Sequence, residues 1–169
     1  MFESIKKKIL LIVIISVFSI NAFATVQEPD LVWYKGKFLI ISNNNGLEVA
    51  GSCYPLSSCT LKIDWSDNTS SRNTANAKGY IATWKISNDS LFLVKIQNGD
   101  FKEIPLQKLF PGQNCVNGLF ASWYNGFFKV ITEDSFLTFD KEVRAKGLIL
   151  LASFKHGVIN EKVEPQSKK

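Results

Sequence analysis

The chain has 169 residues, of which 46% are hydrophobic and 21% charged, with a formal net charge of +5. This length suits one domain with its own hydrophobic core. Beyond the first residues the lysines are scattered singly, without the dense basic stripe of a nucleic-acid footprint, so the composition does not indicate DNA or RNA as a partner.

The first 24 residues have the pattern of a cleavable secretory signal peptide. Lys6, Lys7 and Lys8 precede an apolar run over residues 9–18, and Ala22-Phe-Ala24 supplies a small-x-small cleavage site. The run is too short to cross a bilayer comfortably, and no basic stop-transfer cluster follows it. We therefore expect cleavage after Ala24 and a mature chain without a membrane anchor, either periplasmic or extracellular. Since this leader holds three of the 20 basic and one of the 15 acidic residues, 17 basic and 14 acidic residues would remain.

The cysteines fit an oxidising compartment. Cys53, Cys59 and Cys115 allow at most one intramolecular disulfide. We expect Cys53 to pair with Cys59, closing a short loop that is worth roughly 2 kcal/mol by chain entropy. Cys115 could replace either partner, so the pairing stays open. The single histidine and these cysteines do not supply four zinc ligands, and we expect neither a metal nor a cofactor.

Short strands are predicted from residue 31 onwards. Residues 31–34 and 37–41 predict two strands around the turn Lys35-Gly36. After one possible strand at 61–64, residues 66–76 are dense in turn formers and predict a long surface loop. Trp65 borders this loop, which makes it a candidate partner contact, although a core role explains it equally well.

The most regular alternation of apolar and polar side chains covers residues 80–96 and predicts a hairpin. With Asn88-Asp89 in the turn, Ile86 faces Leu91, Trp84 faces Leu93, and Ala82 faces Lys95. One face then collects the apolar side chains that belong to the core, and the opposite, mixed face holds Ile96. We interpret the hairpin as scaffold, because core packing alone explains the pattern.

The rest of the chain alternates short strands with turns. A short helix is predicted at 105–110 between Pro105 and Pro111-Gly112, and a second one at 140–145 before Gly147. Strands are predicted at 119–124 and 127–131, forming a hairpin around Asn125-Gly126, and at 136–139, 148–154 and 158–159. The fold expected for residues 25–162 is mainly β, an antiparallel meander, barrel or sandwich of short strands with one or two short helices; residues 163–169 are expected to be a disordered tail.

Three strings resemble a group of small uncharacterised secreted bacterial proteins. They are Pro29-Asp-Leu-Val-Trp-Tyr-Lys-Gly36, Lys78-Gly-Tyr-Ile-Ala-Thr-Trp-Lys-Ile86 and Phe120-Ala-Ser-Trp-Tyr-Asn-Gly126. They are similar to a P-D-x-x-x-Y-x-G start, an (R/K)-G-Y-x-A-T-x-x-I strand and a W-(F/Y)-(S/N)-G hairpin. Lys78 stands where the group tends to have Arg and Asn125 where it tends to have Ser, and the group's aromatic and histidine stretch is not evident around Phe139. The resemblance implies fold and export, and no reaction.

Few residues suggest catalysis. His156 is the one imidazole and lies in a predicted tight turn, and nothing in the sequence brings it near Cys115 as a nucleophile. The pairs Asp64 with Asp67 and Glu133 with Asp134 lie at expected turns, where acidic residues are favoured by local hydrogen bonds. We therefore expect no enzyme.

A small exported β scaffold typically presents loops or an edge strand to a partner. The expected function is that of an exported periplasmic binding protein, such as an immunity or inhibitor protein that neutralises a secreted toxin or envelope hydrolase. The alternatives are an envelope hydrolase with an unrecognised site and a structural envelope protein. The identity of the partner and the oligomeric state are left open.

Overall fold

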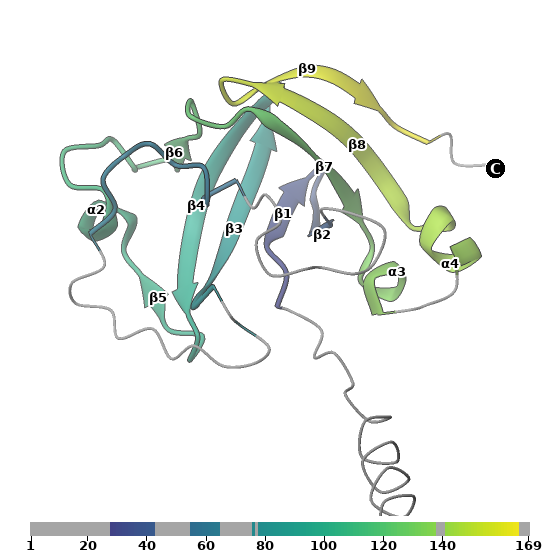
Figure 1. Cartoon of the computed structure of the whole chain (residues 1–169), viewed down its shortest axis with the longest axis horizontal. Coiled ribbons are helices and arrows are strands. Elements are labelled where there is room, and N and C mark those ends of the chain that lie inside the picture. Colours follow the sequence, from purple (N-terminus) through teal and green to yellow (C-terminus); the bar gives the residue numbers. More distant parts are fainter. Residues whose placement is uncertain (1–27, 43–54, 65–75, 77, 138–140, 166–169) are drawn as a thin grey trace, which may run out of the picture.

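The computed structural model describes residues 28–42, 55–64, 76, 78–137 and 141–165 (Figure 1). The predicted leader with Ala24, as well as Cys53, Trp65 and nearly all of the predicted 66–76 loop, lie outside these residues. The fold is mainly β, with short helices, as the sequence predicts. Its elements are β1 (Leu31–Tyr34), β2 (Lys37–Ser42), β3 (Tyr80–Ser87), β4 (Ser90–Asn98), β5 (Glu103–Ile104), α2 (Leu106–Leu109), β6 (Leu119–Phe120), β7 (Gly126–Ile131), α3 (Glu133–Leu137), α4 (Lys141–Lys146), β8 (Leu148–Lys155) and β9 (Val158–Val163).

Seven strands close into a barrel. They follow the order β3-β1-β2-β7-β8-β9-β4, and β4 pairs with β3 again to complete the ring. All neighbours are antiparallel except β1 and β3, which run parallel with Leu31 opposite Thr83. The sequence does not predict this pair. A parallel pair needs a long connection, and residues 35–79, which include β2, supply one.

The ring closes where β4 pairs with β9, and this pairing is short, with Ser90 opposite Val158. The N–H of Leu91 donates to the carbonyl of Gly157 at 2.8 Å, and the N–H of Ile159 donates to the carbonyl of Asp89 at 2.7 Å. The N–H of Gly157 in turn donates to the backbone carbonyl of Tyr124 at 2.9 Å. Gly157 therefore takes part in two of the three bonds that hold this region, the seam of the barrel.

The β3–β4 hairpin has the predicted turn and most of the predicted register. Ile86 lies opposite Leu91 and Trp84 opposite Leu93, as expected. The expected pair of Ala82 with Lys95 is wrong, because a β-bulge beside Trp84 shifts the register and places Ala82 opposite Ile96. A one-residue shift reverses which side chains face inwards, so Ile96 is fully buried in the core instead of lying on the mixed face.

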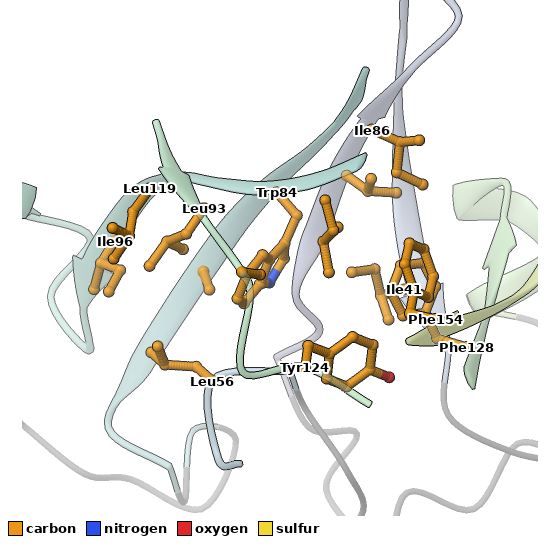
Figure 2. Packing of buried hydrophobic residues seen from close by; sticks show 14 of the residues in the cluster. Ile41, Leu56, Trp84, Ile86, Leu93, Ile96, Leu119, Tyr124, Phe128 and Phe154 are labelled. Carbon is orange, nitrogen blue, oxygen red and sulfur yellow. The ribbon is translucent and has the colours of Figure 1, made fainter. Parts of the chain in front are cut away.

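The barrel interior is filled by large side chains from both halves of the ring (Figure 2). Trp84 and Leu93 pack on one side, and Tyr124, Phe128 and Phe154 pack on the other, with the Phe128 and Phe154 ring centroids 4.8 Å apart. Aromatic side chains bury about 150–250 Å² each, so each contributes roughly 4–6 kcal/mol of transfer free energy. The hairpin predicted as scaffold is therefore part of the core.

Two predicted strands in the second half of the chain are wrong. The segment at 136–139 instead begins inside α3, whose Glu133 and Asp134 favour a helix N-terminus and whose Phe136 N–H donates to the carbonyl of Thr132 at 3.1 Å. The 119–124 strand shortens to β6, which pairs with β4 and not with β7. The backbone turns instead at Ala121, whose carbonyl accepts the N–H of Tyr124 at 2.8 Å.

Candidate functional site

A pocket of about 570 Å³ lies on the outer face of the barrel, beside the β1–β2 hairpin. Its described lining comes from the segment before β1, from β1 to β4, from the β4–β5 turn and from α3: Glu28, Pro29, Leu31, Phe38, Leu39, Ile40, Ile81, Gln97, Phe101, Glu133 and Phe136. Ile40 and Ile81 are buried, yet they do not belong to the core cluster. They alternate with core residues such as Ile41 and Ala82, so they form the floor of the pocket on the outside of the sheet.

The rim of the pocket carries exposed aromatic rings. Phe38 is 64% exposed and forms an edge-to-face pair with Trp33, with the ring centroids 4.5 Å apart. The two residues are opposite each other in the β1–β2 register and point to the same face of the hairpin. Exposed aromatic side chains that border an apolar pocket are typical of binding surfaces.

A tight turn fixes the aromatic ring on the other part of the rim. Phe101, which is 61% exposed, has a left-handed backbone with φ of 61° between β4 and β5. Asn98 holds this turn, because its side-chain oxygen accepts the N–H groups of Asp100 and Lys102 at 3.0 Å each, and Gln97 donates to the Phe101 carbonyl at 2.8 Å. A non-glycine residue in this conformation persists only where its surroundings determine it. The ring is therefore presented by a well-defined turn.

A buried ion pair anchors the strand that forms the pocket wall. Asp30 lies between two lining residues and is completely buried. One carboxylate oxygen accepts the indole N–H of Trp84 at 2.9 Å, and the other accepts the Ala82 N–H at 3.2 Å and the ammonium of Lys78. These bonds tie the start of β1 to β3. They also join the first two of the strings that carry the resemblance, a contact that sequence analysis missed because it spans 48 residues.

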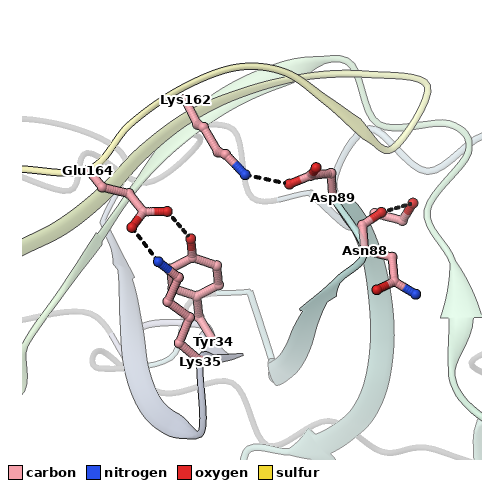
Figure 3. A network of polar contacts seen from close by, with 7 residues as sticks. Tyr34, Lys35, Asn88, Asp89, Lys162 and Glu164 are labelled. Atoms are coloured by element: carbon pink, nitrogen blue, oxygen red, sulfur yellow. Dashed lines mark hydrogen bonds and ion pairs between the residues drawn. The ribbon is translucent and has the colours of Figure 1, made fainter.

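A second polar network ties the last described residues to the β1–β2 turn (Figure 3). The hydroxyl of Tyr34 donates to Glu164 at 2.5 Å, and the ammonium of Lys35 pairs with the same carboxylate. These bonds, the Lys35 bond foremost, hold the pKa of Glu164 below its usual value. Lys162 also pairs with Asp89 at 2.7 Å. The segment after β9, through Glu164, therefore contacts the β1–β2 hairpin, which also carries Phe38 of the pocket rim.

Within the described residues, His156, Cys115 and the Glu133–Asp134 pair lie in separate segments of the fold. His156 is exposed in the β8–β9 turn, where its backbone has φ of 51°. Its backbone N–H, not its imidazole ring, donates to the side-chain oxygen of Asn125 at 2.9 Å. Glu133 and Asp134 both lie in the first turn of α3; Asp64 is exposed, and its predicted partner Asp67 lies outside the described residues.

The described cysteines are free thiols. Cys115 is buried and Cys59 is half-buried, and burial raises the pKa of both thiols. Cys53 itself lies outside the described residues, but Cys59 forms no disulfide in the structure, so the expected Cys53–Cys59 bridge is not supported. Trp65, the candidate partner contact, also lies outside them.

The fold and the pocket together define a small closed β-barrel with an external, aromatic-rimmed pocket. The chain matches no family model, no curated protein and no solved structure at a significant level. None of the helices within the described residues is long and apolar enough to cross a membrane. Within the same residues, no three His, Cys, Asp or Glu side chains are grouped so that they could hold a metal ion.

Proposed function

We propose that this chain is an exported periplasmic binding protein of the immunity or inhibitor type, and that it binds a secreted toxin or envelope hydrolase through the pocket beside the β1–β2 hairpin. The observation that carries this proposal is the exposed rim of Phe38 and Phe101 around an apolar floor. The signal-peptide pattern of residues 1–24 supports export.

The energetics favour a protein partner at this surface. At roughly 25 cal/mol per Å², covering one exposed aromatic ring and its pocket contributes several kcal/mol to association. Binding hot spots are typically large side chains at the centre of such a surface, with neighbours that exclude water. Phe38 and Trp33 form a pair of large exposed side chains that a partner would cover on binding.

The rigidity of the surface supports the same proposal. The Asp30 ion pair fixes β1 to β3, and the Asn98 turn fixes Phe101. A partner therefore meets a surface whose backbone is already held in place, which lowers the entropy cost of association.

The proposal is tested by asking whether the exported chain protects cells from a secreted toxin. Cells that receive a secreted toxin encoded beside this chain should survive when the chain is exported and should die when a version without residues 1–24 stays in the cytoplasm. Purified exported chain should also form a complex with that toxin. Equal survival with both versions, or no complex between the purified proteins, would refute the proposal.

A further inference from the structure

We infer that the pocket receives a basic side chain of the protein partner, an Arg or Lys flanked by apolar residues. This inference rests on the proposed function and adds the chemistry of the occupant. The described charged side chains that line the pocket are negative, whereas the chain as a whole has a positive net charge.

The charged side chains of the described lining are both acidic. Glu28 comes from the segment before β1 and Glu133 from the first turn of α3, and the described part of the lining holds no Lys, Arg or His. Within the described residues neither carboxylate forms an ion pair. The chain as a whole carries a net charge of +5, so the two carboxylates form a local acidic site on a basic protein. Charge complementarity of this kind selects partners and orients them.

The apolar lining suits the rest of such a side chain. Arg and Lys have long aliphatic stems that pack on apolar surfaces while the charged head stays near polar groups. Leu31, Ile40 and Ile81 provide that apolar surface, and Phe38 and Phe101 belong to the same lining. Aromatic rings attract cations to their faces. A guanidinium can also donate charge-assisted hydrogen bonds to a carboxylate.

The surface around the pocket favours a protein over a small cation. The apolar surface continues beyond the pocket to Trp33, which packs against Phe38 and is itself 36% exposed. A small free cation would occupy only part of the pocket of about 570 Å³ and would leave the Trp33 ring in water. A partner loop that presents a basic residue between apolar ones would fill the pocket and also cover the Trp33 ring.

The experiment uses two capped pentapeptides as probes, Gly-Leu-Arg-Leu-Gly and its counterpart with Glu in place of Arg. Each is titrated into the exported, processed chain, and binding is followed by the amide NMR shifts of Ile81, Phe38 and Phe101 and by the methyl shifts of Ile81. We expect saturable shifts at the pocket with the Arg peptide and binding about tenfold weaker or worse with the Glu peptide. The Glu28→Gln/Glu133→Gln variant should remove most of this difference.

A matched control separates the pocket from the overall charge. Glu133→Gln should weaken binding of the Arg peptide about threefold or more. Glu161→Gln, a change of the same charge at an exposed position on β9, should leave it unchanged. The dispersion of the NMR spectrum verifies that every variant is folded.

Two results would overturn the inference. Equal binding of the Arg and Glu peptides, or Arg-peptide binding that survives both glutamine substitutions, would refute the charge preference. No binding of either peptide at the pocket would refute the inference as well. In both cases the protection assay still decides the proposed function, because it does not depend on the occupant being basic.

Discussion

Removing the ammonium of Lys78 should destabilise the barrel severely, because it leaves a buried carboxylate without its counter-charge. Asp30 is 0% exposed, and the Lys78 side chain is only 13% exposed. In the variant Lys78→Met, Asp30 would keep two neutral donors, the Ala82 N–H at 3.2 Å and the Trp84 indole at 2.9 Å. The cation contact of Lys78 with the Tyr80 ring, 5.2 Å from its centroid, would be lost too.

The magnitude follows from the burial. Breaking a buried pair by removing one partner costs about 3–5 kcal/mol, and we expect about 3 kcal/mol because Lys78 reaches the surface. Since a domain has a total stability of about 5–15 kcal/mol, this is a large fraction, and it should lower the melting temperature by about 10 °C. Lys78→Arg keeps the counter-charge of Asp30 and should therefore cost less than Lys78→Met.

The assay is urea unfolding followed by tryptophan fluorescence, with a double-mutant cycle. Asp30→Asn together with Lys78→Met removes both charges, so the double variant should be more stable than the sum of the single effects by about 2 kcal/mol. A cost below about 1 kcal/mol for Lys78→Met, or strict additivity in the cycle, would refute the reasoning.

Two further predictions concern the seam of the barrel and its last described residues. Gly157→Ala should destabilise by about 3 kcal/mol in the same urea assay, because the residue has φ of +75° and an added Cβ would lie 2.5 Å from the Ala121 carbonyl oxygen; a loss below about 0.5 kcal/mol would show that the seam can relax. The depressed pKa of Glu164 means that its bonds to Lys35 and Tyr34 contribute above the ordinary value of 4.5 and are lost as the pH falls through the lower folded pKa. Carboxyl NMR titration should therefore give a pKa for Glu164 below 4.5 that rises in Tyr34→Phe, and an unshifted wild-type titration would contradict the network.

Local patterns predicted much of the barrel. The alternation in β3 and β4 and the residues of the Asn88-Asp89 turn specify a hairpin, since apolar side chains must share one face. The bulge beside Trp84 could not be predicted, because it depends on which side chain the closed core can accommodate. The parallel β1–β3 pair and the β6–β4 pair also depend on contacts between distant segments, which periodicity does not report.

The candidate site was largely hidden in the sequence. Phe38 and Trp33 were visible only as members of short strands, and their exposure became clear once the closed barrel showed which face of the hairpin is outside. Phe101 was not singled out, because its left-handed turn depends on the side chain of Asn98. The sequence did hold one signal for the Asp30–Lys78 pair. Asp30 and Lys78 each precede an apolar strand, and they carry opposite charges that can pair.

The most direct test of the account is the affinity of the partner for two matched variants of the exported chain. Phe38→Ser removes an exposed ring from the pocket rim, whereas Phe127→Ser removes one that is 52% exposed on β7, outside the described pocket lining. Calorimetry with the captured toxin or hydrolase should give a Kd at least about thirtyfold weaker for Phe38→Ser and within about twofold of wild type for Phe127→Ser. Equal affinities for both variants, with both folded, would contradict the assignment of the pocket as the binding site.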